Sequence, residues 1–156
     1  MHGFHGRLLH VDLSTGKSSW HDLPGLRLRA FLGGIGLGTS LLYEYAPARV
    51  EPFSPGNPLI LTSAPLVGTG LTTTAKFGVV TKSPLTGFIG DSLSSSHFAL
   101  ELKRAGLDAV VITGQAASAV YLLISDRNVE IHEAGPLRGK SPNETEAAIR
   151  AELKST

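Results

Sequence analysis

Two short segments carry the residue types that suit the binding of an anion. The first, residues 68–76, reads Gly-Thr-Gly-Leu-Thr-Thr-Thr-Ala-Lys. Its small residues let backbone N–H groups approach a negatively charged group, its hydroxyls add donors, and Lys76 adds a positive charge. The order differs from a Walker A loop, in which Gly-Lys-Ser/Thr stand together at the start of a helix. The segment is either an anion-binding loop or a solvated loop with an exposed lysine.

The second segment is a run of hydroxyl residues, Ser92-Leu93-Ser94-Ser95-Ser96, followed by His97. The pattern predicts a turn that leads into a helix over residues 94–105. Serines at a helix start either cap the helix or bind an anion, and capping is the commoner role. A lone histidine there is more often solvated than an acid–base group. If an anion is bound, we expect it near Lys76 and the turn at Ser92 to Ser96.

Other chemistry finds little support among the residues. The chain has no cysteine, which excludes a disulfide framework, a thiolate zinc site and an iron–sulfur cluster held by this chain's own thiolates. None of its six histidines forms a close ligand pair with a carboxylate. The acidic residues form no dyad, and no serine lies in a nucleophile elbow. We therefore assign no catalytic residue and no metal ligand.

Hydrophobic patterning predicts the elements that must position the two segments. Strands are expected at residues 7–13, 18–21, 58–63, 76–81, 88–89, 107–113, 119–125 and 128–133, and helices at 26–45, 94–105 and 141–153. Asp126-Arg127 marks a hairpin turn, and Ser141, Pro142 and Glu144 form a capping box at the start of the last helix.

Glycines at positions 33, 34, 36 and 38 interrupt the first of these helices. Each costs about 1 kcal/mol in a helix interior, so we expect a break or an unusually close backbone contact. The run resembles a dinucleotide-binding fingerprint only superficially, because no strand precedes it directly.

Composition and element order predict one α+β domain over residues 1–156. Strands adjacent in sequence, with helices between only some of them, favour α+β over a doubly wound parallel sheet. The 42% apolar content suits a packed core, and a net charge of +1 indicates no nucleic-acid surface. No stretch is long enough for a membrane span, and no apolar signal core is present, so we expect a cytoplasmic protein.

Eleven short motifs, in order, give the chain a resemblance that covers nearly its whole length. They are residues 6–7 (GR), 11–16 (VDLSTG), 31–38 (FLGGIGLG), 52–55 (PFSP), 58–60 (PLI), 64–69 (APLVGT), 81–88 (TKSPLTGF), 101–112 (ELKRAGLDAVVI), 129–131 (VEI), 139–140 (GK) and 144–145 (ET). Each motif is weak alone, but their order is specific. The chain resembles the front part of the N-terminal domain of the tungsten-containing aldehyde ferredoxin oxidoreductases.

The resemblance implies a fold and a set of cofactors. Members of that family oxidise aldehydes to carboxylic acids with a tungsten or molybdenum ion held by two pterins, and an iron–sulfur cluster passes electrons to ferredoxin. Their N-terminal domain is an α+β unit with mixed and antiparallel sheets in two intertwined repeats, which cradles the pterins. The cluster's cysteines lie in later helical domains. We therefore expect an incomplete domain of this type, and we expect it not to be catalytic alone.

Carried over position by position, the resemblance predicts cofactor-binding residues at Lys76, Ser92, Leu93, Ser94 and Ser95. The sequence departs from the family pattern here. Lys76 stands where an arginine usually contacts the pterin phosphates, and lysine keeps the charge but loses the bidentate fork. Leu93 replaces an asparagine, and serines at 94–96 stand where glycines are usual.

Two functions are consistent with this sequence. The chain is either one piece of a tungstopterin enzyme, with a complementary chain that carries the cluster-binding domains and ferredoxin as electron partner, or a noncatalytic binding or assembly module that kept the fold and lost the cofactor. In isolation we expect it to form a homo-oligomer, because the family's cofactor and helical domains would otherwise cover its apolar surface.

Overall fold

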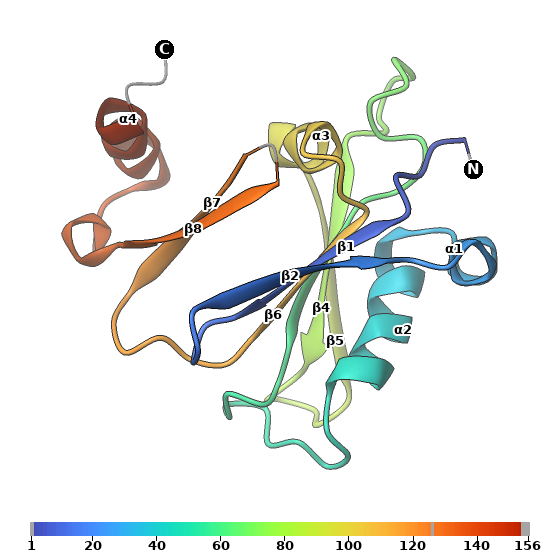
Figure 1. Ribbon diagram of the computed structural model, residues 1–156, viewed down its shortest axis with the longest axis horizontal. Helices are drawn as coiled ribbons and strands as arrows, with labels where there is room; N and C mark the ends of the chain where they lie inside the picture. The colour runs from blue at the N-terminus through green and yellow to red at the C-terminus, as the bar shows by residue number, and fades with distance from the viewer. Residues whose placement is uncertain (1, 126, 154–156) are drawn as a thin grey trace.

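A mixed sheet forms the centre of the molecule (Figure 1). The computed structural model describes residues 2–125 and 127–153, and within them the sheet has six strands in the spatial order β2-β1-β6-β3-β4-β5. The strands are β1 (Arg7–Asp12), β2 (Lys17–Asp22), β3 (Leu59–Thr62), β4 (Lys76–Lys82), β5 (Ile89–Ser95) and β6 (Ala109–Thr113). β1 and β6 run parallel, and every other neighbouring pair is antiparallel.

Four helices, a 3₁₀ turn and a separate two-stranded hairpin complete the described part of the fold. They are α1 (Gly25–Phe31), α2 (Gly34–Tyr45), α3 (His97–Arg104), β7 (Val120–Ser125), β8 (Asn128–Glu133), a 3₁₀ turn (Gly135–Leu137) and α4 (Pro142–Leu153). This mixture of elements confirms the expected α+β class. No helix of the described residues is long and apolar enough to cross a membrane.

The apolar residues form one cluster on each face of the sheet. Helices α1 and α2 pack on one face, where Leu37 and Leu41 are fully buried against Ile60. On the other face, Leu9 and Leu107 are fully buried in a cluster that residues of the β7–β8 hairpin flank. The central strands β1 and β6 contribute to both clusters. Strand β6 is a nearly continuous apolar run, as expected for a strand that is covered on both faces, whereas β1 carries Leu8 on one face and Leu9 and Val11 on the other.

The glycine run interrupts the first predicted helix, as expected. Helix α1 ends at Phe31, Leu32 takes a φ of 60° and Gly33 a φ of 142°, and α2 then begins at Gly34. The backbone N–H of Gly34 donates to the carbonyl oxygen of Ser63 at 2.9 Å. A Cβ atom on Gly33 would lie 2.7 Å from that same oxygen. The glycines therefore provide both the break and the close approach that the sequence predicted.

Gly38 brings α2 close to the sheet, and its replacement by alanine tests this packing. A Cβ atom at this position would lie 2.5 Å from Cγ2 of Val80. We expect Gly38→Ala to lower the free energy of unfolding by about 1–3 kcal/mol, as overpacked cores do, despite the better helix propensity of alanine. Urea titration would measure the change. Gly25→Ala is the matched control, since no atom lies within 4 Å of the added Cβ, and equal stability of both variants would contradict the prediction.

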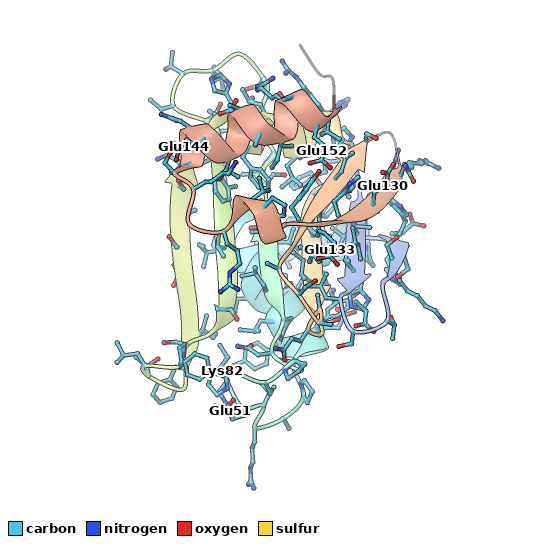
Figure 2. The ribbon with its side chains drawn as sticks, turned by 90° about the vertical axis from the view of Figure 1, so that its left-hand side faces the viewer. Glu51, Lys82, Glu130, Glu133, Glu144 and Glu152 are labelled. Atoms are coloured by element: carbon cyan, nitrogen blue, oxygen red, sulfur yellow. The ribbon has the colours of Figure 1, made fainter. Side chains whose placement is uncertain are left out.

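The C-terminal elements also form as predicted. The hydroxyl of Ser141 accepts from the N–H of Glu144 at 3.3 Å, and the Glu144 carboxylate accepts from the N–H of Ser141 at 2.8 Å. Figure 2 shows Glu144 and Glu152 at opposite ends of α4. The hairpin strands pair from Val120 with Glu133 to Ser125 with Asn128. The first residue of the predicted turn, Asp126, lies outside the described residues.

The boundary near the serine run differs from the sequence prediction. The run was expected to be a turn with a helix from residue 94, after a two-residue strand at 88–89. Instead Ile89–Ser95 forms the edge strand β5, paired along its length with β4. Ser96 is the N-cap of α3, and its hydroxyl accepts from the N–H of Phe98 at 3.1 Å. Capping therefore occurs as predicted, at the last serine of the run.

Candidate functional site: the open edge of the sheet

The predicted lysine and serines lie together at one edge of the sheet. Lys76 begins β4, and Ser95 ends β5 directly opposite it. Strand β5 is the last strand of the sheet, so one side of its backbone has no partner strand among the described residues. All but one of its seven residues are exposed. An edge strand presents a row of free N–H and C=O groups to any molecule that approaches it.

Strand alternation divides the five predicted residues between the two faces of this edge. Lys76 shares the face of Gly78, where a Cβ atom would lie 3.1 Å from Ile35 of α2. Leu93 pairs with Gly78 and Ser95 with Lys76, so both belong to the α2 face.

Ser92 and Ser94 belong to the opposite face. They pair with Val79 and Phe77, and the Phe77 ring lies 4.9 Å from that of Phe98 in α3. The structure therefore brings Lys76, Leu93 and Ser95 together on one face of the edge, with the other two serines behind them.

In the loop of residues 64–75, which precedes β4, several side chains form hydrogen bonds within the loop. The hydroxyls of Thr69, Thr73 and Thr74 donate to loop carbonyl oxygens at 2.7–2.9 Å. The loop also closes onto the site, because the N–H of Ser96 donates to the carbonyl of Ala75 at 3.1 Å. The protons of these three hydroxyls are engaged within the loop, so they are not available as donors to a ligand.

One positive charge, that of Lys76, is available to an anion at this edge. Lys76 is exposed and forms no ion pair within the described residues. One carboxylate, that of Asp91, stands on the same face two positions from Leu93 along β5. An ammonium group with a hydroxyl and edge-strand N–H groups can hold phosphate oxygens.

Two of the histidines, His10 and His21, lie side by side on β1 and β2, at the far end of the sheet from this edge. His10 lies in β1, its Nε2 is 2.8 Å from the hydroxyl of Thr113, and its ring is 5.1 Å from that of Tyr45. Burial, and secondarily the nearby His21, lower the pKa of His10. No group of three metal-ligating side chains occurs among the residues that the structure describes.

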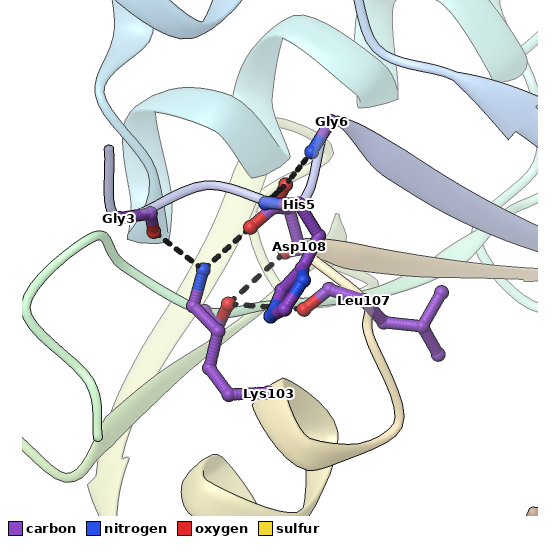
Figure 3. Close-up of polar contacts among 7 residues, drawn as sticks. Gly3, His5, Gly6, Lys103, Leu107 and Asp108 are labelled. Carbon is purple, nitrogen blue, oxygen red and sulfur yellow. Dashed lines mark hydrogen bonds and ion pairs between the residues drawn. The ribbon is translucent and has the colours of Figure 1, made fainter. Parts of the chain in front are cut away.

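A buried ion pair behind the loop is a feature that sequence reasoning missed. Lys103 of α3 and Asp108, just before β6, are 8% and 1% exposed, and their Nζ and Oδ1 atoms are 2.5 Å apart. Figure 3 shows that the pair also holds the N-terminal segment at Gly3, His5 and Gly6. One sequence feature indicated this pair: Lys103 stands next to apolar residues of an amphipathic helix, and a lysine that is buried there requires a polar partner.

The sequence and the fold are similar to those of known proteins. Residues 8–156 match the family model described as the aldehyde ferredoxin oxidoreductase N-terminal domain. The chain is 43% identical over 155 residues to the tungsten-containing aldehyde ferredoxin oxidoreductase of Pyrococcus furiosus, a match that covers 99% of this chain and 26% of that protein. It is 44% identical to the protein of the same name from Thermococcus kodakarensis, over 99% of this chain and 26% of that one.

Two further similar proteins have names that describe enzymes other than aldehyde oxidoreductases. The WOR-like subunit of an aliphatic sulfonate oxidoreductase from Pyrococcus furiosus is 39% identical over 86% of this chain and 22% of its own length. The solved active-site complex BamBC of benzoyl coenzyme A reductase superposes with a TM-score of 0.93 at 36% identity, over 98% of this chain and 23% of that one. The chain spans about a quarter of the length of the curated relatives it matches. It belongs to the aldehyde ferredoxin oxidoreductase N-terminal domain family.

Proposed function

We propose that this chain is the pterin-cradling N-terminal part of a tungsten or molybdenum bis-pterin oxidoreductase. The observation that carries the proposal is the pairing of Lys76 with Ser95 at an open sheet edge. The names of the similar proteins from Pyrococcus furiosus and Thermococcus kodakarensis, which are tungsten-containing enzymes, support it.

The donor set at the edge fits the phosphate end of a pterin cofactor. Lys76 offers a point charge and Ser95 a hydroxyl on the same face, and the edge of β5 offers backbone N–H groups. The side chain of Leu93, 58% exposed on that face, offers an apolar surface. When bound, the cofactor would supply the redox chemistry. The residues of this chain would bind and orient it.

The fit has a limit that follows from residue type. A lysine holds phosphate as a point charge, whereas the arginine usual in the family would grip two oxygens at once. We propose that binding at this edge is therefore weaker than in a relative with arginine, and that other chains or domains complete the cradle. Such a partner would carry the cluster-binding cysteines, and ferredoxin would receive the electrons. In its absence, self-association of the chain is the expected substitute.

Replacing Lys76 by alanine is expected to weaken the binding of inorganic phosphate about tenfold, because it removes one charge-assisted hydrogen bond from the edge. Titration followed by NMR shifts of the β4 and β5 amides would measure the dissociation constant. Lys17→Ala is the matched control, since Lys17 is an exposed lysine on the strand at the far end of the same sheet. If both variants weakened phosphate binding equally, the affinity would depend only on the net charge of the chain and not on Lys76 in particular.

A noncatalytic binding or assembly module is the second candidate function. Two observations favour it. Three threonine hydroxyls donate to carbonyl oxygens of their own loop, and Ser92 and Ser94 lie on the opposite face of the edge from Lys76. The same titration separates the two functions. A wild-type chain that binds neither phosphate nor a pterin cofactor at this edge would favour the module.

A further inference from the structure

We propose that the buried ion pair of Lys103 with Asp108 positions the loop of residues 64–75, and through it the anion site at Lys76. The part of this inference that concerns the anion site rests on the proposed function. The part that concerns the position of the loop does not. The pair lies behind the loop and contacts none of the residues predicted to bind the cofactor (Figure 3).

The pair first fixes the N-terminal segment. The Lys103 ammonium donates to Asp108 Oδ1 at 2.5 Å and to the carbonyl oxygen of Gly3 at 2.9 Å. The other carboxylate oxygen of Asp108 accepts from the N–H groups of His5 and Gly6 at 2.9 and 2.6 Å. Three residues of the N-terminal segment are thus held by two side chains, both more than nine-tenths buried.

The N-terminal segment and Asp108 then fix the start of the loop. The carbonyl of Asp108 accepts from the N–H of Ser63 at 2.9 Å, one residue before the loop begins. Gly3 lies so close to Pro65 that an added Cβ would be 2.7 Å from the Pro65 carbonyl oxygen. Val67, which is 5% exposed, lines one cleft together with Gly3 and Lys103. The loop therefore begins on a surface that the ion pair holds in place.

Helix α3 links the same pair to the end of the loop. Its N-cap, Ser96, donates its N–H to the carbonyl of Ala75, directly before Lys76. Its seventh residue is Lys103. A helix of this length spans about 12 Å and moves as a unit. Displacement of Lys103 would therefore reach the loop at both of its ends.

Removing both charges together tests this role without leaving one charge unpaired. In Lys103→Met/Asp108→Asn, we expect hydrogen exchange at the Val67 and Ser96 amides to rise about tenfold through local opening, with β1 and β6 amides unchanged. We expect the dissociation constant for inorganic phosphate to rise about fivefold or more. Arg150→Met/Glu146→Gln is the matched control, because it neutralises an exposed ion pair on α4, where the two residues are four positions apart.

A second variant keeps the proposal testable if the double variant does not fold. Gly3→Ala leaves the ion pair intact but pushes the terminal segment off Pro65, and at a φ of 82° it also strains the backbone. It should reproduce the faster exchange at Val67. Unchanged exchange at Val67 and Ser96 in every folded variant would overturn the positioning role. If the wild-type chain binds no phosphate, the proposed function fails, while the exchange rates still decide the role of the ion pair.

Discussion

Replacing Lys103 alone by methionine is expected to lower the free energy of unfolding by about 3–5 kcal/mol, because a buried carboxylate loses its partner. Asp108 is 1% exposed, so water cannot take over from the lost ammonium. The carbonyl of Gly3 loses its donor as well. Chemical denaturation with two probes, fluorescence of Trp20 and far-ultraviolet circular dichroism, would measure the change.

The control for this prediction is an exposed ion pair. Arg150→Met breaks the contact with Glu146 on the surface of α4 and should change stability by less than about 1 kcal/mol. Adding Asp108→Asn to the lysine variant should recover part of the lost stability, because no uncompensated charge then remains. Additive losses in the double variant would show that the two side chains do not act as a pair.

The isolated chain is expected to oxidise no aldehyde when an artificial electron acceptor such as a viologen dye is supplied. The residues at the sheet edge can bind and orient a cofactor, but the chain has no cysteine to hold a cluster for electron transfer. It also spans about a quarter of the length of its tungsten-containing relatives. Dye reduction followed by absorbance, with the Pyrococcus furiosus relative as the positive control, would measure it.

Turnover by the isolated chain would contradict this prediction directly. It would place binding, proton transfer and electron transfer within 156 residues. Activity that appears only after addition of a second chain would instead support the proposed division of the enzyme into complementary parts.

Local signals predicted much of the fold. The capping box at Ser141 and Glu144 and the break at Gly33 and Gly34 depend on residues close in sequence, and both occur as predicted. The C-terminal part of β5, Ser92 to Ser95, was mistaken for a turn because serine is common in turns. Its conformation comes from pairing with β4, which depends on residues outside the run.

The candidate site was predictable only in part for the same reason. The sequence places Lys76 and Ser95 in their segments, but their juxtaposition requires the β4–β5 register. A shift of one residue would place Ser94 on the face of Lys76 instead. The ion pair of Lys103 with Asp108 was missed because its third participant, the segment around Gly3, is about a hundred residues away.

The parallel pairing of β1 with β6 has a consequence for the order in which the chain folds. Leu8 stands beside Ala109 and Asp12 beside Thr113, although a hundred residues separate them. The β1–β2 hairpin can form as soon as it is synthesised, but β6 must insert between it and β3 before the sheet exists. Closure of so long a loop carries a large entropic cost that short-range contacts do not share. On the ribosome, β1 therefore lacks its neighbouring strand β6 until residue 113 has emerged, and its unpaired edge is exposed to incorrect pairing during that interval.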